Sequence, residues 1–436
     1  MNVSPVLALA GLAAIGLLVT RLPPIHWRHV TSLDLVLAAG APVVLLGLVL
    51  GPGIDLITRP VVGALAPVMA LAVGWIGAAL GARSEWRYVR RIARATWLLA
   101  ALSTAAVFAV VVLGAWLLGR LIPALSVAWT PRLPALLTLG AVAAVSGPGA
   151  VTLAARAAGI RRSATRALSL AVVLETACGA LVFTLALALH HPHQSAARVA
   201  LGWLAWLAFA VGSGGLVGTV FVSLTRQWPE RADVDFALLA SLLFGAGIGY
   251  AAELSPFLVC ALATALIVNT SPRRQAVRRA LVDWERPIYA AFLVIVGALL
   301  TLPTVWVLVA VPLLAAARIA AKWAAARYGS IALHLAGVPP DVGLGTVAQG
   351  GVAIAMGLNY FMTYRGDGAD AAGASAAGGG LLTTVVLGVV AAQLVAPPLL
   401  GRAMRTPVAR PAAPASLTPA AGPTELGANA PADWSR

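Results

Sequence analysis

Long apolar runs, separated by short polar connections, make up most of this chain. A helix needs about 20 consecutive apolar residues to cross the hydrocarbon core of a bilayer, and runs of roughly this length recur as far as residue 400. The pattern therefore predicts an all-α polytopic membrane protein with about thirteen transmembrane helices. The expected spans are approximately 4–21, 33–51, 60–82, 95–119, 134–156, 164–189, 199–225, 234–252, 255–270, 286–302, 303–325, 341–362 and 378–400.

Two segments interrupt or follow this pattern. Residues 366–380 are rich in glycine, alanine and aspartate, which predicts a flexible loop before the last span. Beyond Arg402 the chain becomes rich in proline and alanine, a composition typical of disorder. We therefore expect a transmembrane domain over residues 1–402 and a disordered cytoplasmic tail over 403–436.

The composition supports a membrane protein and gives the net positive charge a different interpretation. Apolar residues make up 60% of the chain and charged residues only 10%, which excludes an ordinary soluble globular protein. A net charge of +15 would suggest a nucleic-acid partner, but the basic residues, all arginine except Lys322, lie mostly in short loops. We therefore expect no nucleic-acid partner and interpret the arginines as topology signals.

The arginine distribution predicts the orientation of the chain. Assigning the connections alternately to two sides places 25 of the 30 basic residues on one side and five on the other. Because basic residues collect on the cytoplasmic side, we expect an outside N-terminus and a cytoplasmic C-terminus. The expected location is the inner (plasma) membrane.

Two of the predicted spans are broken by glycine or proline near their middle. The fifth span is interrupted by SGPG and the twelfth by QGG. They lie seven spans apart and would cross the bilayer in opposite directions, as two broken helices of an inverted-topology repeat would, meeting at mid-membrane. Glycines that serve helix packing alone would be the simpler explanation. The residues at the two breaks are Ser146, Gly147, Pro148, Gln349, Gly350 and Gly351.

Glu175 is the one carboxylate near the middle of the sixth span. A charge at mid-membrane costs roughly 3 kcal/mol on insertion scales, so such a residue usually has a function. Broken helices beside a buried acid form the ion site of many secondary transporters. Glu175 is therefore our candidate for binding the exchanged cation or proton.

Other polar groups could complete an ion site around Glu175. The hydroxyls of Thr176 and Ser146, and carbonyls freed around Gly147 and Pro148, are hard oxygen ligands suited to a small monovalent cation. Gln349 on the second broken helix is a weaker candidate. We expect Arg318 to be the charge partner of Glu175, with Lys322 as the second choice. A permanent ion pair between Glu175 and Arg318, which only fixes helix packing, is the alternative.

Several motifs resemble the Kef-like and sodium/hydrogen exchangers of the monovalent cation:proton antiporter superfamily. These are SGPGAV (146–151), AAELSPFLVCALATALIVNTSPRRQ (251–275), RPIYAAFLVIVGALLTLP (286–303), AAARIAAKWAAARYGS (315–330) and LGTVAQGGVAIAMGL (344–358). They follow the order found in that family and extend over roughly residues 30–400. The resemblance implies a homodimer of thirteen-span subunits in the lipid bilayer. It also implies an ion site between two broken helices and alternating access by movement of one helix bundle against another.

The chain departs from the family at the ion site. Aligned on Gly179, the family's pair of acids falls on Glu175 and Thr176, so that threonine stands where the family has its carrier aspartate. Gly147 likewise replaces the aspartate of the family's T-D-P motif. Either Glu175 has taken over the carrier role, or the protein no longer exchanges cations in the usual way.

The sequence therefore favours one function and leaves one alternative open. The favoured function is exchange of a monovalent cation, sodium or potassium, for protons by a homodimer. The alternative is a non-exchanging relative, either a membrane scaffold or a transporter of another solute. We expect no enzyme, cofactor or metal site, because no nucleophile–base pair or metal-ligand cluster appears in the sequence.

The predicted orientation can be tested with cysteine accessibility. Single cysteines at Gly368 and Ala420 should react with a membrane-impermeant reagent from opposite sides of the membrane, because one predicted span separates them. Labelling of both positions from the same side would contradict the thirteen-span map.

Overall fold

The structure, a computed structural model, describes residues 10–11, 14, 40–53, 59–129, 132–157, 162–190, 199–226, 231–333, 341–364 and 371–405. Nearly all of the first predicted span, residues 4–21, lies outside these ranges. So do residues 406–436, which contain most of the predicted tail. The following description concerns the described residues only.

All of the regular structure in the described ranges is helical. The first half of the chain contains α3 (Ala41–Leu48), η1 (Val49–Gly53), α4 (Arg59–Ala64), α5 (Ala66–Gly81), α6 (Trp86–Val89), α7 (Arg94–Leu121), α8 (Pro123–Ala128), α9 (Arg132–Ala144), α10 (Pro148–Ala157), α11 (Arg162–Leu189) and α12 (Val199–Thr225). The second half contains α13 (Arg231–Ala251), α14 (Pro256–Thr270), α15 (Arg274–Ala298), α16 (Trp306–Ala332), η3 (Val342–Thr346), α17 (Gly351–Tyr364) and α18 (Ala371–Arg405).

The lengths of these helices confirm an all-α polytopic membrane protein. Within the described ranges, six helical segments are long and apolar enough to cross a bilayer, and the bent pair α9 and α10 would add a seventh. Shorter apolar helices occur at 41–53, 66–81 and 256–270. Each predicted span from the second to the thirteenth overlaps one or more of the observed helices.

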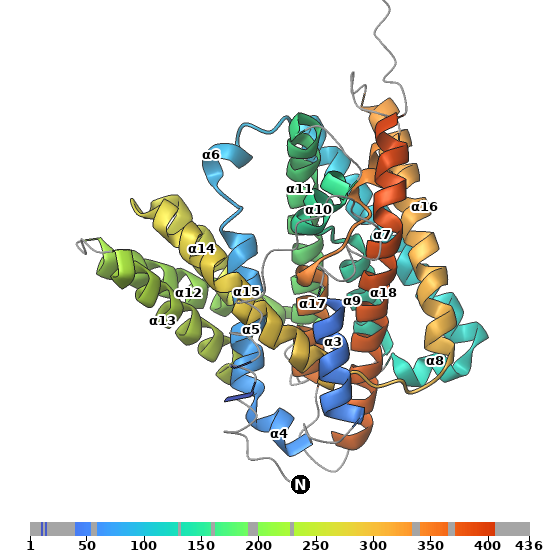
Figure 1. Cartoon of the computed structure of the whole chain (residues 1–436), viewed down its shortest axis with the longest axis horizontal. Helices are drawn as coiled ribbons and strands as arrows, with labels where there is room; N and C mark the ends of the chain where they lie inside the picture. The colour runs from blue at the N-terminus through green and yellow to red at the C-terminus, as the bar shows by residue number, and fades with distance from the viewer. Residues whose placement is uncertain are drawn as a thin grey trace, which may run out of the picture.

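The helices form two groups, which Figure 1 shows side by side. The panel bundle consists of α5, α12, α13, α14 and α15, and it shares one cluster of buried residues that includes Trp75, Phe221 and Cys260. The site bundle consists of α7, α9, α10, α11, α16, η3, α17 and α18. All of these except α10 and η3 contribute to the largest core. α17 also packs against α5, so the two bundles are in contact at the centre of the molecule.

The two predicted breaks are present and meet inside the site bundle. α9 ends at Ala144 and α10 begins at Pro148, with a bend of 41° between them. In the second broken span, η3 ends at Thr346 and α17 begins at Gly351. The backbone N–H of Gly147 donates a hydrogen bond of 2.9 Å to the carbonyl of Ala348, which joins the two unwound segments directly.

The predicted flexible loop at 366–380 is wrong in its second part. α18 begins at Ala371, so the last ten residues of that segment are helical. Its glycines serve close packing: a Cβ at Gly379 would lie 2.4 Å from Thr301 Oγ1, and one at Gly380 would lie 2.8 Å from the carbonyl of Ala128. The same helix continues to Arg405, past the domain boundary that we predicted at 402.

The helix that covers most of the predicted span at 286–302 begins well before that span. α15 runs without interruption from Arg274 to Ala298 and contains Pro287. Here the polar stretch before it is also helical, so α15 includes the preceding connection.

The close approach at the crossing predicts opposite effects of two neighbouring alanine substitutions. A Cβ at Gly147 would lie 2.6 Å from the backbone nitrogen of Gly350, whereas nothing lies within 4 Å of a Cβ at Gly149. Gly147→Ala should therefore cost about 1–3 kcal/mol of stability. Gly149→Ala, inside α10, should be neutral or stabilise by up to about 1 kcal/mol. Thermal unfolding of the purified protein measures both, and equal stabilities would contradict the observed crossing.

Candidate ion-binding site

Glu175 lies at the centre of α11, beside the crossing of the broken helices. It is about 20 Å from either end of this helix at 1.5 Å per residue, and it is only 5% exposed. An ionised carboxylate in this position needs a charged or hydrogen-bonded partner. The sequence placed Glu175 correctly near mid-span, and its partners come from three other elements.

Both carboxylate oxygens of Glu175 accept hydrogen bonds. Ser103 of α7 donates to Oε1 at 2.8 Å. Lys322 of α16 donates to Oε2 at 2.7 Å and forms an ion pair with it. Ser146 at the first break has its hydroxyl 2.8 Å from the same oxygen. The carboxylate is therefore held by an ammonium group and two hydroxyls.

Lys322 is the ion-pair partner of Glu175, so the preference for Arg318 was wrong. The ammonium nitrogen is fully buried and lies 2.8 Å from Ser146 Oγ and 3.4 Å from Thr346 Oγ1, in addition to its contact with Glu175. All three of these neighbours are oxygen atoms. The ammonium thus occupies a position in which a monovalent cation would find one carboxylate and two hydroxyl ligands.

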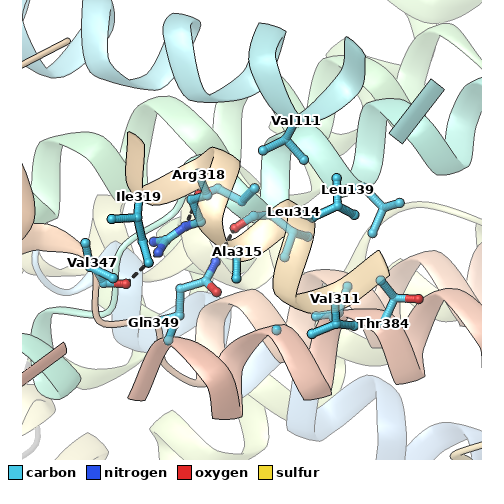
Figure 2. A pocket seen from close by; sticks show the side chains of 15 residues that line it. Val111, Leu139, Val311, Leu314, Ala315, Arg318, Ile319, Val347, Gln349 and Thr384 are labelled. Atoms are coloured by element: carbon cyan, nitrogen blue, oxygen red, sulfur yellow. Dashed lines mark hydrogen bonds between the residues drawn. The ribbon is translucent and has the colours of Figure 1, made fainter. Parts of the chain in front are cut away.

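Arg318 holds the backbone of both breaks together instead. Its Nε donates to the carbonyl of Ala143 at 2.6 Å, and its Nη2 donates to that of Val145 at 3.2 Å. Its Nη1 donates to the carbonyl of Val347, in the second break, at 2.6 Å. Figure 2 shows the guanidinium between Val347 and Gln349, at the end of a small cavity of about 50 Å³ that is lined mainly by apolar side chains.

Two further side chains bind carbonyls near the breaks. The amide of Gln349 donates to the carbonyl of Val142 at 2.8 Å. The hydroxyl of Thr176 is within hydrogen-bonding distance of the carbonyls of Ser146 and of Val172, the latter at 2.6 Å. Of the carbonyls around Gly147 and Pro148, those of Val145, Ser146 and Gly147 accept hydrogen bonds from Arg318, Thr176 and the Val151 N–H. Oxygen ligands for a cation remain at Glu175, Ser146 and Thr346.

A larger cavity reaches the crossing from the side of the panel bundle. Its volume is about 480 Å³, and Gly147, Pro148, Gly350 and Gly351 form part of its wall. Other parts of the wall come from α5 and α15, including Tyr289, and its charged lining residues are Arg83, Glu285 and Arg286. The arginines belong to the side of the protein that the sequence predicts to be cytoplasmic.

Three residues of this network were not singled out from the sequence. Ser103, Thr346 and Gln393 are each buried, and the amide of Gln393 donates to the carbonyl of Gln349. Each is a polar residue within an apolar or glycine-rich run, and that was the only available signal. Many such residues bind their own helix backbone instead, as Thr184 does in α11.

The site combines one carboxylate with two cationic side chains that have different roles. Arg318 donates to three backbone carbonyls, while Lys322 is paired with the carboxylate through its ammonium. Lys322 can leave Glu175 without freeing a carbonyl at the breaks. No group of three or more histidine, cysteine, aspartate or glutamate residues that could hold a metal occurs in the described ranges.

Comparison with known proteins gives a consistent result at the level of the fold. No protein-family model and no curated protein sequence matches the chain. A solved structure of the sodium proton antiporter MjNhaP1 from Methanocaldococcus jannaschii at pH 8 matches with a TM-score of 0.68 and 14% sequence identity. This match covers 92% of the present chain and 99% of that chain.

A second structure of the same antiporter, from electron microscopy, matches with a TM-score of 0.60 and 15% identity, covering 92% of the present chain and 96% of that one. At these identities the likeness establishes the fold and leaves the activity open. The fold that the sequence motifs implied is confirmed: this chain shares the fold of the sodium proton antiporter MjNhaP1.

Proposed function

We propose that this protein is a secondary active transporter that exchanges a monovalent cation, sodium or potassium, for protons. The observation that carries the proposal is the position of the Lys322 ammonium. It lies against Glu175, Ser146 and Thr346, at the crossing of two broken helices, in a fold shared with a sodium proton antiporter. These oxygens are the ligands that a monovalent cation would use in its place.

Charge balance determines how the exchange would work. Glu175 and the protonated Lys322 together are neutral, and both are buried. A cation that takes the place of the ammonium would add one positive charge unless Lys322 loses its proton, and an uncompensated buried charge is strongly unfavourable. One cation bound would therefore release one proton, so the site would have the same charge in both of its loaded states.

Arg318 would take no part in the exchange. Its guanidinium is bound to carbonyls of both breaks and remains charged under all ordinary conditions. We therefore assign it a positioning role, in which it keeps the two unwound segments in register while Lys322 alternates between its two protonation states.

Access to the site would alternate between the two membrane surfaces. The cavity of about 480 Å³ beside the crossing supports a path from the arginine-rich side. Movement of the site bundle against the panel bundle would close this path and open another, as the antiporter fold suggests. We also propose a homodimer, which the resemblance of the sequence motifs to the exchangers implies.

One observation favours a second function, that of a membrane scaffold or a transporter of another solute. Glu175 has a hydrogen-bonding partner at each oxygen and a lysine at 2.7 Å, an arrangement that could be permanent. Thr176 also stands where the related exchangers carry their aspartate, and its hydroxyl contacts backbone carbonyls. In this reading the ion pair fixes the packing of α11 against α16.

Substitution of Glu175 separates the two functions. Glu175→Gln removes the only carboxylate among the ligands, so it should abolish dissipation of a pH gradient in proteoliposomes on addition of Na⁺, K⁺ or Li⁺. Glu253→Gln, in the turn that follows α13, is the matched control and should transport normally. Normal transport by Glu175→Gln would contradict the proposal.

A double substitution controls for the loss of a buried charge partner. Glu175→Gln alone leaves Lys322 buried without its carboxylate, which costs about 3–5 kcal/mol when the charge persists. Glu175→Gln with Lys322→Gln removes both charges and should restore thermal stability without restoring transport. If the double variant regains wild-type transport, neither side chain carries the ion.

A further inference from the structure

A groove on the outer surface of the site bundle combines an apolar lining with several charged side chains. It has a volume of about 510 Å³ and lies between α16, η3 and α18. Its lining includes Ala316, Ala320, Trp323, Arg327, Asp341 and Arg402. It is separate from the cavity at the crossing, with which it shares no lining residue.

The groove is apolar along its length and polar at one end. On α16 it runs from Ala316 to Arg327, about 16 Å at 1.5 Å per residue, or about half the thickness of a bilayer's hydrocarbon core. The small side chains of Ala316 and Ala320 keep its floor open, and both are exposed. One lipid tail spans the same depth, from the headgroup level to the middle of the bilayer.

The polar end is built from a tryptophan, an aspartate and two arginines. Trp323 Nε1 donates to Asp341 Oδ1 at 2.8 Å, and Arg327 pairs with the same oxygen at 3.6 Å. The guanidinium of Arg327 also lies over the Trp323 ring, 5.6 Å from its centroid. Arg402, from α18, also lines the groove and is exposed. The net charge of these side chains is +1, which favours an anionic headgroup.

We propose that this groove binds one anionic phospholipid, with an acyl chain along α16 and its phosphate beside Arg327 and Arg402. Tryptophan and arginine are the side chains that mark the headgroup level of a membrane. Apolar contact alone gives a lipid tail little preference for the groove over the bilayer, because the surrounding lipid is equally apolar. The selectivity should therefore come from the arginines, each expected to change binding of an anionic headgroup about fivefold.

Native mass spectrometry of the full-length protein in detergent tests this site with phosphatidylglycerol and phosphatidylcholine of identical acyl chains. The wild type should retain one phosphatidylglycerol in clear preference to phosphatidylcholine. Arg402→Gln should reduce this preference about fivefold. Ala320→Trp, which fills the groove without changing its charge, should reduce the binding of both lipids. Arg90→Gln, an exposed arginine outside the groove, should leave both unchanged, and thermal unfolding without added lipid checks that each variant folds.

Several outcomes would overturn the proposal. One is equal retention of the two lipids by the wild type, and another is unchanged binding in both groove variants. Displacement of the lipid by soluble glycerol phosphate would show a simple anion site without an acyl groove. Conversion of a dimer to a monomer by Ala320→Trp, with lipid binding unchanged, would show that a second copy of the chain occupies the groove. None of these readouts depends on transport activity.

Discussion

The buried ion pair between Glu175 and Lys322 is the interaction on which the rest of this structure depends. Both groups lie in the interior of the site bundle, where neither could remain charged without the other. They come from α11 and α16. Ser146, at the first break, contacts both of them, and Thr346, beside the second break, contacts Lys322. The pair therefore fixes four elements around one point, and any ion that enters must replace one of its members.

The unwound segments around the pair are stable because protein donors bind the carbonyls nearest to it. In a membrane each unsatisfied backbone group costs several kcal/mol, so a broken helix requires such partners. The donors are Arg318, Gln349 and Thr176. The close approach of Gly147 and Gly350 brings the two unwound segments near enough for these donors to reach both. Of the two buried cationic side chains beside the crossing, Arg318 is bound to carbonyls of the breaks. Lys322 is the one that can change its partner.

Patterns within single helices were predictable from the sequence, and contacts between helices were less so. Proline and glycine inside apolar runs identified both breaks, and one carboxylate at mid-span identified Glu175. Arg318 and Lys322 are four residues apart on α16 and share one face. Which of them reaches Glu175 therefore depends on how α16 is rotated about its axis and shifted along it when it packs against α11. Ser103 and Thr346 were missed because a hydroxyl in an apolar run has the same appearance whether it binds a carboxylate or its own backbone. The glycines at 378–380 were misread as flexible because their packing partners, Thr301 and Ala128, lie far away in the sequence.

Proton release on cation binding tests most directly whether Lys322 and the cation compete for Glu175. The full-length protein is held in weakly buffered detergent solution at a pH where Lys322 is protonated, and Na⁺ or K⁺ is added while a pH indicator is followed. The wild type should release about one proton for each cation bound, because a cation and the ammonium cannot occupy the same oxygen ligands. Lys322→Gln should release none. Cation binding by the wild type without proton release, or an unchanged release from Lys322→Gln, would contradict this account.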